Sequence, residues 1–258
     1  MNKFYSVLLA LLFLPAWCVA DDHDNEKPEQ MIADSWVAVP KAGHENEFEE
    51  ALKAHLALRT ERGDPRTWHV YVPVTGKDLN RYVIRSCCFA WADQDSYGEW
   101  SRENMGKHFN ETVHPHVATY HHNFSELDQK NSHWGEDTKA NYVGVTMFHI
   151  KPGKGGQMSE AIGEMSTLAK DHEWPRNWSW FYPVGGAHAV GLATPFENYA
   201  DMAPMDENFY QFAKKHLKSE KKTEKLFDKF SGAHSGGDYT IWRHRADFHP
   251  KKEDAKED

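Results

Sequence analysis

The sequence predicts an α+β fold in which a βαββαβ unit occurs twice in tandem. Two observations support this prediction. A twelve-residue segment at 65–76 recurs at 175–186 with six identities and an offset of 110 residues, whereas unrelated segments would share about one residue. In addition, the apolar periodicity around each copy predicts the same order of strands and helices in both halves of the chain.

In the first half, the clearest helical pattern is an apolar stripe that includes Phe48, Leu52, Leu56 and Arg59. Short β-branched and aromatic runs, bounded by Pro and Gly, predict the strands around it. The predicted order is strand, helix, strand, strand, helix and strand, at 36–39, 45–62, 67–74, 81–91, about 93–112 and 116–124.

The second half repeats this pattern. At the offset of 110, Phe48 aligns with Met158 and Leu52 with Ile162, so the register extends from the repeated strand to the helix before it. Thr194-Pro195-Phe196-Glu197 has the form of a capping box and predicts a helix start. The other predicted elements are strands at 143–150, 178–184, 188–194 and 238–245, and helices around 158–168, 206–217 and 219–230.

The repeated strand is apolar on both faces. Trp68, Val70 and Val72 fall on one side, and Tyr71 and Pro73 fall on the other. The helices of a βαββαβ unit cover one face of its sheet, so the other face needs a partner sheet. We therefore expect the two ferredoxin-like units, 34–124 and 142–248, to pack their sheets face to face, with 125–141 as a polar linker.

The termini predict how the chain is processed. Residues 1–20 have the charged start, apolar run and small-residue end of a signal peptide cut after Ala20, which predicts a periplasmic or secreted protein. No later stretch is apolar for long enough to span a membrane. Residues 21–33 read as a disordered acidic leader, and 249–258 as a charged tail.

Composition excludes some classes of protein. Without residues 1–20, 29 basic residues would face 39 acidic ones, and a net charge near −10 disfavours nucleic acid as a partner. Cys87 and Cys88 would then be the only cysteines. Adjacent side chains on a strand point to opposite faces, so we expect no bond between them and no disulfide scaffold.

The order of elements, with the turn Pro152-Gly153-Lys154 between a strand and a helix, resembles the dimeric α+β barrel superfamily. Its antibiotic-biosynthesis-monooxygenase-like and NIPSNAP-like members are the most similar. The resemblance covers roughly 34–124 and 140–246, and it implies a monomer with an internal pseudo-dimer. The superfamily includes cofactor-independent oxygenases, haem-degrading enzymes, isomerases and proteins without known activity, and no catalytic signature of any of them is matched, so the fold does not choose among them.

Aromatic residues of the two repeated strands are candidates for the walls of a ligand cavity between the sheets, where a small hydrophobic or aromatic molecule would bind. The alternative is that they fill the core. The candidates are Trp68, Trp178, Trp180 and Tyr182.

A second pair of candidates, Arg66 and Arg176, is charged in both copies, which apolar packing does not explain. The two guanidinium groups could bind a carboxylate at the mouth of the cavity. Alternatively, they form ion pairs with Glu61 and Glu173.

The chain has 17 histidines, which suggests a metal or haem as well as surface or capping positions. No single element combines histidines and carboxylates at ligand spacing, so the sequence assigns no metal ligand and leaves the cofactor open. Aligning Tyr120 with Trp242 places two of the histidines in equivalent last strands, where they could meet across the pseudo-twofold axis. The candidates for a general base or polar contact are His69, His122, His188 and His244.

These observations support two functions and leave catalysis open. The first is an extracytoplasmic barrel that binds a small molecule, for which the resemblance implies an oxygenase-type reaction, cofactor-independent or haem-linked. The alternative is a non-catalytic binding or interaction protein with histidine-rich, metal-binding edges. An open cavity with two or more inward histidines favours the first, and a cavity filled by Trp and Tyr favours the second.

Overall fold

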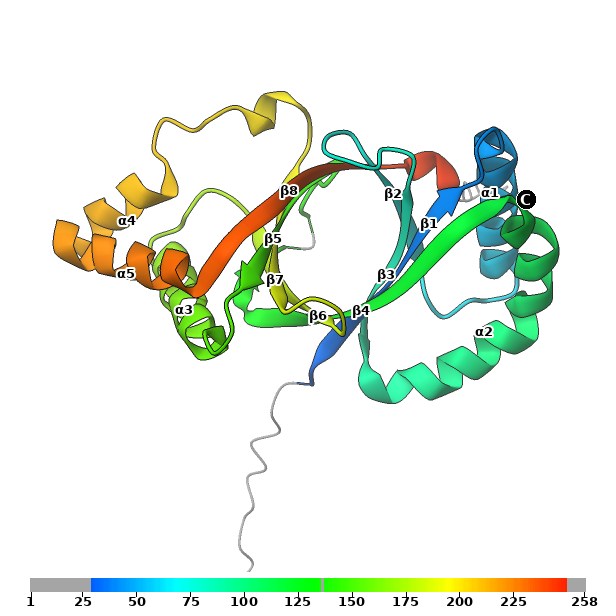
Figure 1. The fold of residues 1–258 in the computed structure, drawn as a ribbon, viewed down its shortest axis with the longest axis horizontal. Coiled ribbons are helices and arrows are strands. Elements are labelled where there is room, and N and C mark those ends of the chain that lie inside the picture. The colour runs from blue at the N-terminus through cyan, green and yellow to red at the C-terminus, as the bar shows by residue number, and fades with distance from the viewer. Residues whose placement is uncertain (1–28, 136, 250–258) are drawn as a thin grey trace, which may run out of the picture.

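Eight antiparallel strands close into a barrel in the computed structural model, which describes residues 29–135 and 137–249 (Figure 1). The order around the barrel is β1-β3-β2-β8-β5-β7-β6-β4. The strands are β1 (Met31–Pro40), β2 (Trp68–Pro73), β3 (Tyr82–Ala90), β4 (Val117–His133), β5 (Tyr142–Ile150), β6 (Trp178–Val184), β7 (Ala189–Phe196) and β8 (His234–His244).

Helices cover the outside of the barrel on two opposite sides (Figure 1). Those of the first half lie on one side and those of the second half on the other. The helices are α1 (Glu45–Glu61), α2 (Gln94–His108), α3 (Gly155–Asp171), α4 (Phe209–Leu217) and α5 (Glu220–Ala233). Of the helices in the described residues, none is both long enough and apolar enough to cross a bilayer.

The two halves have the same sheet order. The first runs β4-β1-β3-β2 and the second β8-β5-β7-β6. β2 pairs with β8 and β4 with β6, so the outer strands of each half pair with those of the other. The two sheets are therefore joined edge to edge into one barrel, whose strands leave no free sheet edge. The mixed α+β class predicted from the sequence is confirmed.

The apolar core of the first half lies outside the barrel, between its sheet and α1. Val70 and Trp68 pack there against Phe48 and Leu52, so the helix-facing side of β2 is the side with the tryptophan. Because side chains alternate along a strand, His69 and Tyr71 face the barrel interior. Trp68 thus does not lie between the two sheets, where the sequence analysis placed it.

The second half packs in the same way. Trp178 and Trp180 lie in a buried cluster with Met158 and Ile162 of α3, and Tyr182 packs against it. The candidate cavity walls of this half are therefore core residues, which was the alternative left open by the sequence, and they do not lie between the sheets.

Two segments expected to be irregular are strands. Ile32 and Ala33 belong to β1 and are fully buried, although 21–33 was predicted to be a disordered leader. Residues 125–133 were predicted to be linker but extend β4, which pairs with β6 from Phe124 to His133. Pairing with a strand from the other half stabilises a polar segment that has no local apolar pattern. The predicted signal peptide and most of the predicted tail lie outside the described residues.

Residues 194–197 do not begin a helix. Thr194, Pro195 and Phe196 end β7 and pair with β5, and a 3₁₀ turn at Ala200–Met202 follows. The next helix, α4, begins after Asn208, which forms a reciprocal capping box with Gln211. Tertiary strand pairing outweighs the local capping signal in this segment.

Cys87 and Cys88 form a disulfide, which contradicts the prediction made from strand alternation. The peptide bond between them is cis. They lie at a bulge, where Ile32 pairs with Phe89 and Ala33 with Cys87, so Cys88 has no partner on β1. The alternation of a regular strand does not apply there.

Candidate functional site

A cavity of about 450 Å³ lies between the sheet of the first half and the helices α1 and α2. Its volume is in the range of small-molecule sites, and most of its walls are apolar or aromatic. The cavity is on the helix side of the sheet and not inside the barrel. Its aromatic walls are Trp36, Phe48, Trp68, Tyr97, Phe109 and Tyr120.

A carboxylate and an imidazole meet on the sheet wall of this cavity. Asp34 of β1 is 3% exposed, and its Oδ1 lies 2.8 Å from Nε2 of His122 on β4. The His122 ring stacks on Trp36 with ring centroids 4.2 Å apart, which holds the imidazole flat against the wall. The carboxylate accepts the hydrogen of Nε2, so Nδ1 keeps its lone pair and can act as a base.

Arg66 approaches the same carboxylate from the loop before β2. Its Nη1 lies 3.6 Å from Oδ2 of Asp34, and its Nη2 donates to Oε1 of Gln94. The guanidinium is held between the rings of Phe89 and Tyr97, with its carbon 3.3 and 3.5 Å from their centroids. Burial lowers the pKa of Arg66 from its usual value, and nearby acidic groups oppose the shift.

Arg66 forms an ion pair, as one of the two alternatives expected, but with another partner. Its ion-pair partner is Asp34 and not Glu61. Nη1 is buried and makes no hydrogen bond to any described residue. Arg66 therefore places a positive charge beside the Asp34–His122 pair, although it does not itself line the cavity.

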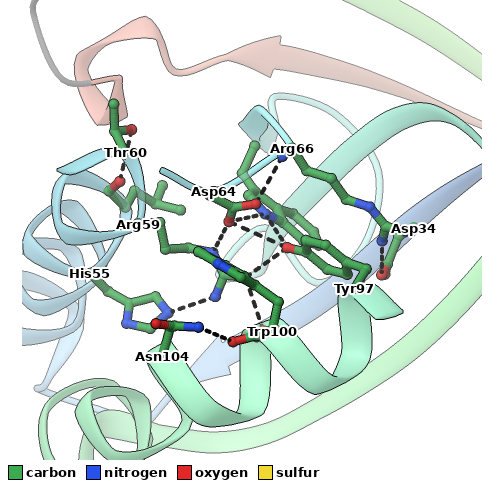
Figure 2. Close-up of polar contacts among 12 residues, drawn as sticks. Asp34, His55, Arg59, Thr60, Asp64, Arg66, Tyr97, Trp100 and Asn104 are labelled. Atoms are coloured by element: carbon green, nitrogen blue, oxygen red, sulfur yellow. Dashed lines mark hydrogen bonds and ion pairs between the residues drawn. The ribbon is translucent and has the colours of Figure 1, made fainter. Parts of the chain in front are cut away.

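A second polar cluster lies between α1 and α2, and three of its members, Arg59, Trp68 and Tyr97, line the cavity (Figure 2). Nε of Arg59 donates to Oδ2 of Asp64 at 2.6 Å, and Nη2 donates to the hydroxyl of Tyr97 at 2.7 Å. The indole nitrogen of Trp68 donates to the same hydroxyl at 3.0 Å. Burial is the main cause that raises the pKa of Tyr97, so its phenol stays protonated. These bonds hold Trp68 and Tyr97 as rigid walls.

His55 lies beside Arg59 and is uncharged near neutral pH. Burial, and then the charge of Arg59, lower its pKa to about 3. Nη1 of Arg59 lies 3.3 Å from Nε2 of His55, and a guanidinium only donates, so Nε2 is the acceptor. Nδ1 of His55 then carries the hydrogen and donates to Nδ1 of His108, 3.1 Å away. Both nitrogens of His55 are therefore engaged.

The other sequence candidates lie elsewhere. Arg176 donates to the carbonyl of Asp201 and contacts the sulfur of Met205, so it ties two loops together. His188 is exposed in the turn between β6 and β7 and lies on neither strand. His69 and His244 meet at the β2–β8 pairing, 3.3 Å apart between ring nitrogens.

His122 and His244 are not equivalent, which corrects the alignment of the two last strands. His122 pairs with Trp36, and Thr146, which is 110 residues after Trp36, pairs with Tyr239. The counterpart of His122 is therefore Tyr239. His122 faces the helices of the first half, whereas His244 lies opposite Tyr71 and faces the barrel interior.

Several residues of the site were missed by the sequence analysis. Asp34 stands in an apolar strand, and Arg59 stands in the buried stripe of α1, where a charge requires a partner. This mismatch between charge and apolar surroundings was the available signal. At the offset of 110, the second half has apolar residues or glycine in place of the polar network of Asp34, His55, Arg59 and Asp64: Gly144, Met165, Ala169 and Trp174.

Comparisons with known proteins identify the fold. No protein-family model and no curated protein matches the chain. Crystal structures of putative monooxygenases from Lactobacillus acidophilus and Fusobacterium nucleatum are each similar at 11% identity and a TM-score of 0.54, covering 84% of this chain and 94% of theirs.

The structure of an anthrone oxidase-like protein is similar at 9% identity and a TM-score of 0.50, covering 85% of this chain and 92% of that one. Identities this low show shared architecture and not shared activity. The chain thus shares the α+β barrel fold of these proteins.

Proposed function

We propose that this chain is an extracytoplasmic oxygenase-type enzyme that binds a small aromatic molecule in the cavity of its first half. The observation that carries the proposal is the Asp34–His122 pair on an aromatic cavity wall. The sequence of residues 1–20 supports the location. The 110-residue repeat and the matching sheet order support an origin by duplication of a ferredoxin-like unit.

The substrate class follows from the cavity. Its aromatic walls suit a planar ring system, and the base suits a molecule with an acidic hydroxyl or activated C–H group. Nδ1 of His122 takes this proton, and the Asp34 carboxylate, 2.8 Å from Nε2, stabilises the imidazolium that forms. The resulting substrate anion is electron-rich and can react with dioxygen: one oxygen atom becomes a new carbonyl on the ring, which is oxidised, and the other leaves as water with two hydrogens of the substrate. Two similar structures are described as putative monooxygenases, which supports this reaction type.

The cavity contacts favour the cofactor-independent form over the haem-linked one. Both nitrogens of His55 are engaged, and Asp34 takes Nε2 of His122. Neither histidine of the cavity therefore offers a free Nε2 to haem iron.

Oxygen uptake tests the proposal with the anthrone dithranol and with 1-naphthol as probes. We expect His122→Ala to lower kcat about 100-fold or more, which is the usual contribution of a general base. The matched control is His121→Ala, because His121 is adjacent on β4 and points to the other face of the sheet. Equal rates in the His122→Ala and wild-type proteins would refute the assigned base.

A ligand-binding measurement separates the two functions left open by the sequence. If the wild type quenches 1-naphthol fluorescence on binding but consumes no dioxygen with any probe, the chain is a non-catalytic binding protein. An enzyme would consume dioxygen in the presence of a probe, and this consumption would require His122.

A further inference from the structure

Three histidines converge where the two halves meet at the β2–β8 pairing. His69 lies on β2, His244 ends β8, and His249 follows the 3₁₀ turn Ala246–Phe248. Nδ1 of His69 is 3.3 Å from Nε2 of His244, which is 3.2 Å from Nε2 of His249. One ring nitrogen from each residue lies within 4.8 Å of the other two, and all three residues are half-buried.

Two of the three spacings, those from His244 to His69 and to His249, match the coordination shell of a tetrahedral metal ion. Zinc binds imidazole nitrogen at about 2.0–2.1 Å, which places two nitrogens of a tetrahedral shell about 3.3–3.4 Å apart. Neighbouring nitrogens of an octahedral shell with the same bond length would be only about 2.8–3.0 Å apart. The observed 3.3 and 3.2 Å are nearer the tetrahedral value.

Hydrogen bonding among the three rings leaves one contact unexplained. A neutral imidazole nitrogen has one hydrogen or one lone pair, so Nε2 of His244 can satisfy one neighbour and not two. A cation between the rings would accept a lone pair from each residue.

The protonation state of the cluster suits a metal ligand. Burial is the main cause that lowers the pKa of His244 and His249, and it lowers that of His69 to about 4. Neutral imidazole is the form that binds metals. Arg85 adds a positive charge near His69 that opposes a cation, whereas Asp247 adds a negative charge near His244.

We propose that His69, His244 and His249 form a binding site for a divalent transition-metal ion, with zinc the best geometric fit. Three protein ligands leave one position for water or a small molecule. The site joins β2 of the first half, β8 of the second half and the C-terminal segment. The β2–β8 pairing has three register pairs against six for β4–β6, so the metal would link the halves where their strands pair least.

Zinc titration of the full mature chain tests the site, using a chromophoric chelator as competitor and native mass spectrometry for stoichiometry. We expect one zinc ion per chain to bind more tightly than any other. His249→Ala should weaken this ion at least about 100-fold, because loss of an outer-shell partner alone costs about 10–100-fold. His69→Ala and His244→Ala should have the same effect.

Another histidine pair provides the matched control. His44 is exposed and His116 half-buried; their ring nitrogens lie 3.3 Å apart, and no third histidine joins them in a metal-binding group among the described residues. The double variant His44→Ala/His116→Ala should retain the tight ion. If the control loses the ion and His249→Ala keeps it, the assignment is wrong.

Copper spectroscopy of the wild type gives an answer that does not depend on how the variants fold. With one equivalent of Cu²⁺, electron paramagnetic resonance should show hyperfine coupling to three nitrogens. Coupling to fewer than three, or no tight metal ion in the wild-type chain, would overturn the proposal.

Discussion

Replacing Arg59 with alanine should destabilise the first half strongly. The Arg59 and Asp64 side chains are 9% and 2% exposed and lie 2.6 Å apart. Removing the guanidinium leaves the Asp64 carboxylate buried without its ion-pair partner, and removes bonds to Tyr97 and Ser101. Breaking a buried ion pair in this way costs about 3–5 kcal/mol of the free energy of unfolding. A loss of that size corresponds to a fall of about 6–20 °C in Tm for a domain of this length.

Guanidinium-induced unfolding, followed by tryptophan fluorescence and far-UV circular dichroism together, measures this loss. The matched control is Arg62→Ala, because Arg62 directly follows α1, is exposed, and donates a hydrogen bond to the carbonyl of Asn104. We expect the control to cost under about 1 kcal/mol. The double variant Arg59→Met/Asp64→Asn should recover part of the loss, since no unpaired charge remains. A loss below about 1 kcal/mol for Arg59→Ala would refute the assigned pairing.

Two further predictions concern a buried histidine and two glycines. The folded-state pKa of His55, about 3, lies below its unfolded value near 6.5. The unfolded chain therefore takes up a proton first as the pH falls, so the contribution of His55 to the free energy of unfolding is present above about pH 6.5 and is lost toward pH 3. Protonation of His55 in the unfolded chain should lower the free energy of unfolding by about 2 kcal/mol between pH 7 and pH 5. Denaturant unfolding measures this pH dependence, and His55→Gln should flatten it over that range. A Cβ added at Gly191 would overlap Cζ of the Phe181 ring, so Gly191→Ala should cost about 1–3 kcal/mol. A Cβ added at Gly98 on α2 meets nothing within 4 Å, so Gly98→Ala should stabilise the protein by about 0.5–1 kcal/mol. Thermal melts that rank these two glycine variants in the opposite order would contradict the packing described.

The repeat and the periodicity around it predicted most of the helices and strands. The helix predicted at 45–62 is α1 at Glu45–Glu61, and α3 at Gly155–Asp171 lies 110 residues further along. The strand predicted at 178–184 has the same bounds as β6. These elements could be predicted because the apolar stripe of a helix and the alternation of a strand are local properties of the sequence.

The candidate site was predicted only in part. Trp68, Arg66 and His122 were named, and all three lie at or beside the cavity. The cavity was expected between the two sheets but lies on the helix side of one, because alternation defines two faces of a strand but does not say which one the helices cover. Asp34 and Arg59 were missed, since the ion pairs that stabilise a buried charge involve residues distant in the sequence.

The sequence by itself determined the duplicated order of elements, because each helix and strand has its pattern within about twenty residues. Only the tertiary structure decided how the barrel closes, since 125–133 becomes a strand through pairing with β6. It also decided that the cavity with the Asp34–His122 pair lies in the first half and that His249 joins His69 and His244. These features depend on contacts between residues far apart in the chain, and local patterns carry no information about such contacts.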